Sequence, residues 1–430
     1  MSIVHKIESH LPQKFVDNWR FIKLYLRKQR QYKRVIKRLK KKESPIRVFF
    51  FALDPSTWKY ESVYRLMEKD DKFDPIVLVC PIDNQGEEYK HNKLEECYKY
   101  FFLNNYNVIS TYDKVHDTYL DAHELKPDII FYTNPYRYLI DDGYYIDKFD
   151  DVLTCYVDYS LEIMNERWAY SQPLQQLVWK YFVPSNQHKN IVESSEHCFV
   201  DNARVSGYPT SDLFLKELAK SKKNERKVIV WAPHQSIFVP KTDDEKSVRW
   251  STFLLYADDM MSTIRKNKDI HFIFRPHPLL KTNLYNHLEW GKERTDKYYE
   301  ELLSLPNVEL SVGDYIEQFC KSDALIHDGG GFMAEYIYTQ KPCLYLSNYI
   351  CEYIDKNRFN ELGIAAWKAH YHAYGKNDID NFIEHVVIEG NDSMRKQRAE
   401  VLHTYLAPTQ SGSVAENITG IIKSEISNIK

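Results

Sequence analysis

At 430 residues the chain is longer than one hydrophobic core usually serves, so we expect two domains of roughly 200 residues each. Its 43% hydrophobic share, 28% charged share and formal net charge of -3 are ordinary for a globular protein and give no sign of a nucleic-acid partner. Seven scattered cysteines without CxxC spacing argue against a disulfide framework or a zinc site and indicate reduced thiols, as in the cytoplasm. No segment approaches the ~20 consecutive apolar residues of a membrane span.

The first predicted element is a basic amphipathic helix within residues 1–44. No acidic residue occurs between Asp17 and Glu43, whereas twelve lysines and arginines do. Apolar residues recur there mostly at spacings of three or four: Phe15, Trp19, Ile22, Leu26, Ile36 and Leu39. This pattern is typical of a helix on an anionic membrane surface, and it fits equally a solvated arm or a helix packed on its own domain. An arm for nucleic acid is disfavoured because no recognisable binding module follows it.

From residue 46 onward, apolar and β-branched runs alternate with helix-like stretches, which is typical of parallel strands with crossover helices. The predicted strands are 46–53, 75–80, 128–132 and 152–157 and, after a lysine-rich passage at 216–227, 228–233, 270–276, 324–327 and 342–346. We therefore predict an α/β fold of two Rossmann-like doubly wound domains, residues 45–215 and 216–430, with the C-terminal helices in the second. The loops after the strands of two such domains would face a shared cleft.

Three loops that follow predicted strands in the second domain each carry a histidine. They read PHQSI at 233–237, RPHP at 275–278 and HDGGG at 327–331. A single histidine after a strand is more often a hydrogen-bonded structural residue, but three together indicate a ligand site. The predicted donor-binding residues of the first and last loops are His234, Gln235, Ser236, His327 and Asp328.

The glycine triplet of the last loop directly precedes a predicted helix over Phe332 to Thr339. Gly329, Gly330 and Gly331 would lie where free amides and the helix dipole attract anions, and side chains there would block a phosphate. Glu335, about 6 Å further along the helix, could accept the hydroxyls of a nucleotide ribose. The structural alternative is a tight turn that needs positive φ angles, with Glu335 as a solvated helix residue.

The motifs GYP at 207–209, WAP at 231–233, RPHP at 275–278 and DALIHDGGGFMAEYIYTQKPCLYL at 323–346, in this order, resemble the CDP-glycerol glycerophosphotransferase family. This family contains teichoic-acid and capsule polymerases of the GT-B superfamily. Its segment SDYSSVMFDY matches HDGGGFMAEY, so Asp328 keeps the pattern and Gly330 and Gly331 replace two serines. The histidine that the family places after an arginine matches His277 after Arg275, and the resemblance implies that both act on phosphate charge.

The first half departs from the family at one motif. A His-Gly motif like HGTPLK would fall near residues 155–163, where no histidine occurs. Asp158 follows a buried-looking strand there and is the best substitute base, and it could equally be a helix N-cap. Two other loops could contribute to an acceptor site or be caps and turns. The candidate acceptor residues are Trp58, Asn134, Tyr136, Tyr159 and Ser160.

The resemblance implies a GT-B transferase that uses a nucleotide-activated, CDP-linked donor and needs no separate cofactor or metal. It would transfer a polyol phosphate to a lipid-linked or oligosaccharide acceptor, with Asp158 as base and His277 and Arg275 stabilising phosphate charge. We expect the protein to be cytoplasmic and peripheral at the inner face of the cell membrane. Two alternatives stay open: a GT-B glycosyltransferase that uses a nucleotide-sugar, and a non-catalytic, nucleotide-sensing subunit of a polysaccharide assembly.

Overall fold

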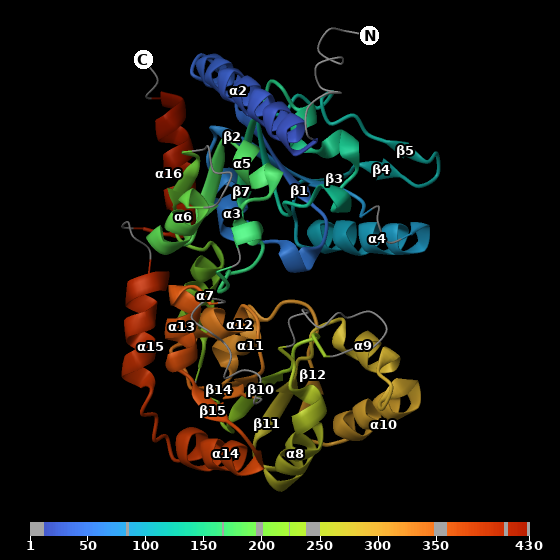
Figure 1. Ribbon diagram of the computed structural model, residues 1–430, viewed down its shortest axis with the longest axis vertical. Helices are drawn as coiled ribbons and strands as arrows, with labels where there is room; N and C mark the ends of the chain where they lie inside the picture. Colours follow the sequence, from blue (N-terminus) through green and yellow to red (C-terminus); the bar gives the residue numbers. More distant parts are fainter. Residues whose placement is uncertain are drawn as a thin grey trace. The chain divides into compact units, whose positions relative to one another are not determined.

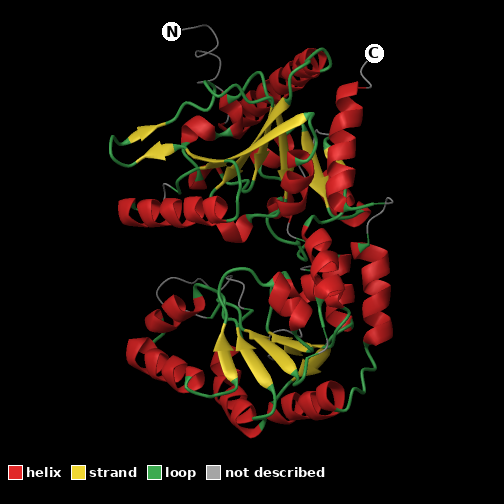
Figure 2. Cartoon of the chain, turned by 180° about the vertical axis from the view of Figure 1, so that it is seen from behind, coloured by secondary structure: helices red, strands yellow, loops and turns green. Residues whose placement is uncertain are grey.

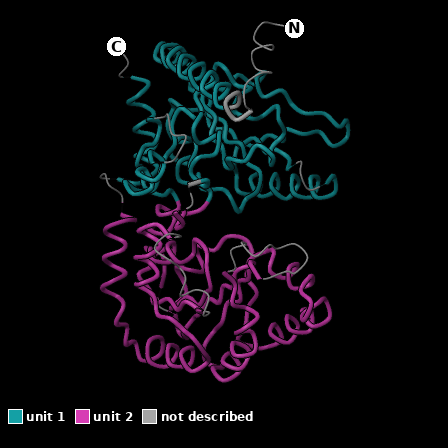
Figure 3. Tube along the Cα trace, viewed as in Figure 1, with its two compact units in different colours: residues 1–159, 167–209, 408–430 teal, residues 160–166, 210–407 magenta. Residues whose placement is uncertain are grey.

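The computed structural model describes residues 13–82, 86–165, 167–194, 201–222, 224–237, 250–347, 359–407 and 412–427. The chain forms two compact units, which Figure 3 colours separately. Unit 1 comprises Met1–Tyr159, Arg167–Pro209 and Pro408–Lys430, and unit 2 comprises Ser160–Glu166 and Thr210–Ala407. The chain therefore passes between the units more than once.

Unit 1 contains a parallel sheet of seven strands in the order β3-β2-β1-β6-β7-β8-β9. Its strands are β1 (Ile46–Ala52), β2 (Phe73–Val79), β3 (Val108–Ser110), β6 (Ile129–Tyr132), β7 (Leu153–Val157), β8 (Lys180–Val183) and β9 (Ala203–Val205). A separate antiparallel pair joins β4 (Tyr112–Asp113) to β5 (Thr118–Tyr119). The helices are α2 (Gln13–Leu39), α3 (Glu61–Glu68), α4 (Glu87–Leu103), α5 (Pro173–Leu177), α6 (Asn186–Glu193) and α16 (Val414–Ser427), with short 3-10 turns η1 (Pro55–Thr57), η3 (Arg137–Leu139), η4 (Asp142–Tyr144), η5 (Ile146–Lys148) and η6 (Arg167–Tyr170).

Unit 2 contains a parallel sheet of six strands in the order β12-β11-β10-β13-β14-β15. Its strands are β10 (Val228–Ala232), β11 (His271–Phe274), β12 (Val308–Leu310), β13 (Ala324–His327), β14 (Cys343–Leu346) and β15 (Tyr371–Ala373). Its helical elements are α7 (Thr210–Lys220), α8 (Phe253–Lys266), α9 (Leu280–Asn286), α10 (Gly291–Leu303), α11 (Ile316–Lys321), α12 (Phe332–Glu335), η7 (Tyr336–Thr339), α13 (Glu361–Lys368), α14 (Lys376–Asn381), η9 (Phe382–Ile388), α15 (Arg395–Val401) and η10 (Leu402–Leu406).

The strands are apolar along their length because both faces of each sheet are covered. In β1, Phe50 lies in one buried cluster and Phe51 in another, on opposite faces of the same strand. Helices flank the sheet on both sides in each unit (Figures 1 and 2). The predicted α/β class is therefore confirmed, and all eight predicted strands form.

Both units follow the strand order 3-2-1-4-5-6 when the strands of the parallel sheet are counted along each unit, and unit 1 adds a seventh strand at its edge. In this order the connections turn to opposite sides after the first strand, which opens a crevice at the carboxyl ends of the two central strands. Those strands are β1 and β6 in unit 1 and β10 and β13 in unit 2. Ligands of doubly wound domains bind at these switch points.

Helix α2 is an integral part of unit 1. Its second half buries Tyr32, Val35, Ile36 and Leu39, and the Tyr32 hydroxyl donates to the Leu177 carbonyl at 2.7 Å. The Lys28 ammonium is fully buried and donates to the Phe149 carbonyl, and burial lowers its pKa to about 8. Of the alternatives for the basic segment, the helix packed on its own domain is therefore the one observed.

The first half of α2 presents another face to solvent. Trp19, Ile22 and Leu26 are exposed, as are most of the lysines and arginines along the helix. None of the helices in the described part of the chain is long and apolar enough to span a membrane.

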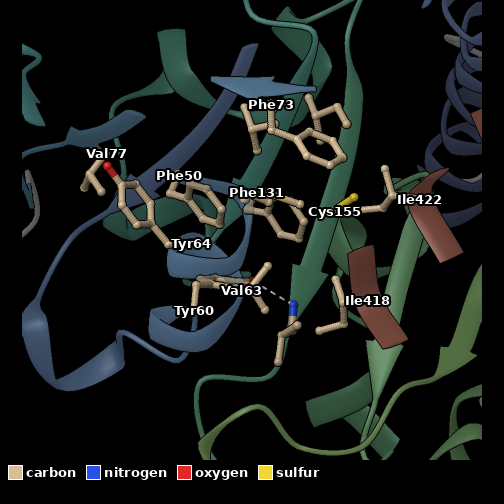
Figure 4. Close-up of a cluster of buried hydrophobic side chains, with 14 of the residues drawn as sticks. Phe50, Tyr60, Val63, Tyr64, Phe73, Val77, Phe131, Cys155, Ile418 and Ile422 are labelled. Atoms are coloured by element: carbon tan, nitrogen blue, oxygen red, sulfur yellow. Dashed lines mark hydrogen bonds between the residues drawn. The ribbon is translucent and has the colours of Figure 1, made fainter. Parts of the chain in front are cut away.

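The last helix corrects the expected domain division. The prediction assigns residues 408–430 to the second domain, whereas α16 packs against α3 and α2 of unit 1. Its apolar stripe includes Val414, Ile418 and Ile422, and Figure 4 shows the last two beside Phe131 and Cys155 of the sheet. The helix returns to unit 1 because this stripe completes that unit's core.

Candidate functional site

Three loops of unit 2 leave the carboxyl ends of adjacent strands. His234 follows β10, His277 follows β11, and Asp328 follows β13. The backbone joins the first two loops, because the His277 amide donates to the Pro233 carbonyl at 3.0 Å. The imidazole rings of His234 and His277 lie 5.4 Å apart between centroids. The structure thus brings together two of the three predicted histidines.

Asp328 joins the first and third loops from inside the unit. Its carboxylate accepts the His234 amide at 2.6 Å, the Thr252 amide at 2.7 Å and the Ser251 hydroxyl at 3.1 Å. Burial raises the pKa of this carboxyl to about 7, although these donors act in the opposite direction. With 1% of its surface exposed, Asp328 positions the loops and does not itself present an oxygen to a ligand.

Both clustered histidines accept a hydrogen bond from the backbone amide two residues further on. The Ser236 amide donates to Nδ1 of His234 at 3.2 Å, and the Leu279 amide donates to Nδ1 of His277 at 3.2 Å. Since an amide can only donate, the ring proton of each neutral histidine resides on Nε2. The Ser236 hydroxyl lies 2.8 Å from Nδ1 of His234 and accepts the Trp250 amide, which reinforces this tautomer.

Burial keeps both rings neutral. It lowers the pKa of His234 to about 3 and that of His277 to about 4. At neutral pH each ring therefore offers one N–H donor without a formal charge. Sequence spacing indicates neither the tautomer nor the protonation state, because both follow from contacts with the backbone and from burial.

Each glycine of the triplet is explained by a different contact. Gly330 has a φ of 72°, and a Cβ there would lie 3.7 Å from Nε2 of His234. A Cβ on Gly329 would meet Cβ of Trp250 at 2.6 Å, and one on Gly331 would meet the Leu161 carbonyl oxygen at 3.3 Å. The glycine loop therefore lies beside the donor nitrogen of His234; a Cβ would clash at Gly329 and be crowded at Gly331, whereas Gly330 is required by its φ.

The predicted helix after the triplet is present in two parts, α12 and the 3-10 segment η7. Glu335 is buried, so the alternative of a solvated helix residue is wrong. Its carboxylate accepts the Tyr315 hydroxyl and lies 3.5 Å from the Cβ position of Gly331. Glu335 therefore faces back toward the start of its own helix.

Arg275 is held by the loop that follows β12. Its guanidinium donates to the Ser311 hydroxyl at 2.7 Å, to the Gln318 side chain at 3.0 Å and to the Gly313 carbonyl. These bonds fix the end of β11 from which the His277 loop departs. Arg275 thus contacts protein groups in this structure.

The remaining residues of the predicted donor set lie at different depths. The Gln235 carbonyl accepts the Asn283 side-chain amide at 3.0 Å, which ties the first loop to α9. His327 is fully buried, with Nδ1 3.3 Å from the Gly329 nitrogen and 3.4 Å from the Gly329 oxygen. Its ring packs against Tyr345 and His370, so His327 does not join the pair formed by His234 and His277.

The family model for CDP-glycerol:poly(glycerophosphate) glycerophosphotransferase matches residues 162–423, which is more than half of the chain. The chain belongs to this family. It is therefore a transferase of polyol phosphate with a nucleotide-linked donor, and the resemblance predicted from the strand-end motifs is confirmed.

Solved structures show the same fold at low sequence identity. The wall teichoic acid polymerase TagF has a TM-score of 0.54 and 13% identity, over 94% of this chain and 98% of TagF. MnaA of S. aureus, solved with UDP, has a TM-score of 0.53 and 14% identity, over 90% of this chain and 98% of MnaA. UDP-GlcNAc 2-epimerase from Neisseria meningitidis, bound to UDP-GlcNAc, has a TM-score of 0.52 and 13% identity, over 89% of this chain and 100% of the epimerase. The fold is therefore GT-B, as predicted, and no curated protein matches the chain.

The glycerophosphotransferase match begins at residue 162 and leaves the predicted base, Asp158, outside it. In unit 1, Asp158 follows β7 and is largely buried. The Tyr181 hydroxyl lies 2.7 Å from each carboxylate oxygen, and the Gln175 amide donates to one of them at 3.3 Å. No helix in the described residues begins beside Asp158, so the N-cap alternative is wrong. Tyr181 belongs to β8, a strand that the sequence pattern missed, so its contact with Asp158 was missed too.

The predicted acceptor residues of this glycerophosphotransferase are mostly engaged in local structure. Trp58 is buried among aromatic rings, and its Nε1–H donates to the Tyr106 hydroxyl at 3.1 Å. The Asn134 side chain accepts the Tyr136 amide at 2.9 Å, which is a turn contact. Tyr136 and Tyr159 lie 6.4 Å apart between ring centroids, and both are half-buried. Ser160 is also half-buried and begins the short segment assigned to unit 2.

Proposed function

We propose that the chain transfers a polyol-phosphate unit, glycerol phosphate in the simplest case, from a CDP-linked donor to a hydroxyl of a growing surface polymer. The observation that carries this proposal is the pair of neutral imidazoles beside a glycine loop at the switch point of unit 2. Nucleotide ligands of doubly wound domains bind at that point. Family membership supplies the chemical class of the donor.

The donor pyrophosphate is assigned to the glycine loop and to His234. The first amides of a helical stretch have no acceptor within the helix and are free to bind phosphate oxygens. Nε2–H of His234 lies beside Gly330 and adds a neutral donor to the same place. Glu335, whose carboxylate reaches back over Gly331, is assigned to the ribose hydroxyls.

In the reaction, the oxygen of the acceptor hydroxyl attacks the phosphorus of the transferred unit and forms a new phosphate ester. The bond from that phosphorus to the bridging oxygen breaks, and CMP leaves with the electron pair. Nε2–H of His277 is assigned to the phosphate oxygens, where a fixed donor stabilises charge that grows in the transition state. Arg275 acts through the position of the His277 loop.

Asp158 is the proposed acceptor of the hydroxyl proton. Tyr181 and Gln175 hold its carboxylate in one orientation, and an oriented carboxylate can remove a proton as the oxygen attacks. Among the candidate acceptor residues, Tyr136 and Tyr159 are the half-buried aromatic surfaces near this strand end. We assign the acceptor, lipid-linked or oligosaccharide, to unit 1.

We also propose that α2 brings the enzyme to the inner face of the cell membrane. Its exposed face combines three apolar side chains, Trp19, Ile22 and Leu26, with a dense array of lysines and arginines. Apolar side chains that enter the headgroup region and cations that attract anionic lipids act together in peripheral binding.

One experiment distinguishes the proposed function from two others, a glycosyltransferase and a nucleotide-sensing subunit. The purified full-length chain is incubated with CDP-glycerol, UDP-N-acetylglucosamine and a GDP-linked sugar, with and without a lipid-linked acceptor, and the released nucleotides are separated. Acceptor-dependent CMP from CDP-glycerol supports the proposal. A nucleoside diphosphate released from a nucleotide-sugar would identify a glycosyltransferase instead. Tight nucleotide binding with no release under any condition would identify the nucleotide-sensing subunit, an alternative suggested by the missing His-Gly motif near Asp158.

A further inference from the structure

A second group of polar side chains lies in unit 2, on the inner side of the glycine loop. His327 is the last residue of β13, Cys343 is the first residue of β14, and His370 directly precedes β15. All three side chains have 0% of their surface exposed. One potential ligand atom from each lies within 4.8 Å of those from the other two.

The strand register explains how these distant residues meet. Cys343 pairs with Leu325, and Leu344 pairs with Tyr371, so Cys343 and His370 are at the same level of the sheet. Side chains alternate between faces along a strand, and His327 lies two residues beyond Leu325, so it shares their face. The cluster is therefore built by the pairing of three adjacent parallel strands.

The cluster contains hydrogen-bonding atoms for which the described part of the chain offers no hydrogen-bond partner. Nε2 of His327 and both ring nitrogens of His370 have no hydrogen-bond partner among the described residues. Buried polar nitrogens almost always have a partner, because burial without one is unfavourable. The Ala369 backbone lies near the His370 ring, but neither ring nitrogen makes a well-formed hydrogen bond with a described residue. Such an imidazole, beside a thiol and a second imidazole, indicates a group that binds to all three.

The chemistry of the ligand atoms selects that group. Two imidazole nitrogens and a thiolate are ligands that zinc prefers, and a site with three protein ligands leaves a fourth position for water. In a tetrahedral zinc site neighbouring ligand atoms are roughly 3.4–3.6 Å apart. The side chains would therefore close by about 1 Å at the widest pair, which here is within 4.8 Å.

Of the groups around the cluster, one favours metal binding and one opposes it. When Nε2 of His327 binds a metal, its Nδ1–H can donate to the Gly329 carbonyl, 3.4 Å away, and such bonds orient metal-binding imidazoles; the Gly329 amide, which donates to Nδ1 at 3.3 Å in this structure, would then lose that acceptor. Burial raises the pKa of the Cys343 thiol well above its usual value, and the nearby buried guanidinium of Arg398 acts in the opposite direction but repels a cation. The ion pair between Arg398 and Asp392, together with the thiolate charge, offsets this repulsion.

We propose that His327, Cys343 and His370 bind a zinc ion that joins β13, β14 and β15 beneath the glycine loop. The sequence predicts no metal because the three residues are 16 and 27 positions apart, from 327 to 343 and from 343 to 370, without a zinc-finger spacing. The site is separate from the proposed donor contacts, although Nδ1 of His327 lies 3.3 Å from the Gly329 amide of the glycine loop.

The test measures metal content and a cobalt spectrum on the full chain. The protein is purified without chelators, its zinc is determined by mass spectrometry, and the metal-free form is titrated with Co²⁺. We expect about one zinc per chain and a thiolate-to-cobalt charge-transfer band in the near ultraviolet. Zinc far below one per chain together with no such band would overturn the proposal and leave the space to water.

Substitutions in the cluster test whether the cobalt charge-transfer band arises from it. Cys343→Ser and His370→Gln should each lower the zinc content and the affinity for Co²⁺ at least tenfold. Cys320→Ser is the matched control, because Cys320 is a buried cysteine of the same unit outside the cluster. A band that persists in Cys343→Ser, or that disappears in Cys320→Ser, would contradict the assignment. Should a variant fail to fold, the zinc content and the cobalt spectrum of the wild type still decide.

Discussion

The two units share a strand order but differ in the residues that their strand-end loops carry. In unit 2, the loops at the switch point carry imidazoles tied to their own backbone and three glycines, of which Gly329 would clash with Trp250 if it had a Cβ and Gly330 has a positive φ. In unit 1, the corresponding loops carry Asp54 and Asn134, which cap local turns, and Trp58, which fills the core. The same topology thus provides equivalent positions, and the two units carry different residue types there.

Unit 1 has instead one oriented carboxylate, Asp158, at a strand next to its switch point. We therefore propose that the donor phosphates bind to unit 2 and the acceptor hydroxyl to unit 1. Each assignment can be tested by a substitution that should change either the rate of transfer or the affinity for the donor, but not both.

The largest effect is expected for Asp158→Asn. Loss of a general base should lower the rate of transfer about 10²–10⁴-fold while donor affinity stays unchanged. Steady-state rates with saturating acceptor and calorimetry with CDP-glycerol measure the two quantities. Tyr181→Phe, which removes the hydroxyl that orients the carboxylate, should give a smaller loss of rate. Wild-type transfer by Asp158→Asn would remove the acceptor role from unit 1.

His277→Ala should lower the rate about 10²–10³-fold with little change in donor affinity, because its N–H acts on charge that grows in the transition state. His287→Ala is the matched control. Its Nδ1 also accepts the amide two residues further on, at 3.3 Å, but it lies outside the site. Equal losses in the two variants would show that the local turn, and not the chemistry, is responsible.

Gly330→Ala should weaken donor binding about tenfold, because the methyl group occupies the phosphate side of the loop and the φ of 72° disfavours alanine by about 1 kcal/mol. Gly390→Ala has the same backbone cost, at a φ of 81°, with open space around it. Calorimetry with CDP-glycerol on both folded variants distinguishes the effect of backbone strain from that of a methyl group in the phosphate site. Unchanged donor affinity in Gly330→Ala would exclude the triplet from the phosphate site.

Leu26→Glu should reduce binding to anionic vesicles roughly threefold to tenfold and spare transfer to a short soluble acceptor. Deletion of α2 is not an equivalent test, because it would also remove Tyr32, Val35 and Leu39 from the core. Leu103→Glu, at an exposed leucine on α4, is the control for an added charge. Vesicle sedimentation that does not distinguish the two variants would assign the membrane contact elsewhere.

The smallest effect concerns pH. Burial lowers the pKa of His277 to about 4, whereas in the unfolded chain it is about 6.5. The unfolded chain therefore binds the proton more readily between these values, and stability is highest above pH ~6.5 and falls as the pH decreases toward ~4. We expect a loss of about 1 kcal/mol at pH ~5, allowing for partial exposure. The difference between the free energies of unfolding of the wild type and of His277→Gln, measured in urea, should show this loss, because His234 and Asp328 titrate in both proteins.

The sequence predicts the architecture better than the edges of the sheets. Long apolar runs such as β1 and β7 identify the central strands because both faces are buried. The missed strands β3, β9, β12 and β15 have three residues each, which is too few for a hydrophobic period. β8 was missed for another reason: it contains Lys180, whose ammonium is buried in an ion pair with Glu425.

At the site, sequence position predicts which loops converge, because strand order decides that. It does not predict the function of each residue. Asp328 and Arg275 match the family pattern and are bound to protein groups, and His327 is buried against His370. These outcomes depend on side-chain direction and burial, which a motif does not contain.

Helix α16 has a consequence for the order in which the protein folds during synthesis. Residues 210–407 form most of unit 2 and are complete before α16 is translated, whereas the core of unit 1 still lacks Val414, Ile418 and Ile422. The strands of unit 1 emerge first but can acquire their final packing only when the last residues leave the ribosome. A released chain truncated before residue 414 should therefore resist protease in described elements of unit 2 such as α10 and α11 and remain cleavable near Phe131 and Cys155.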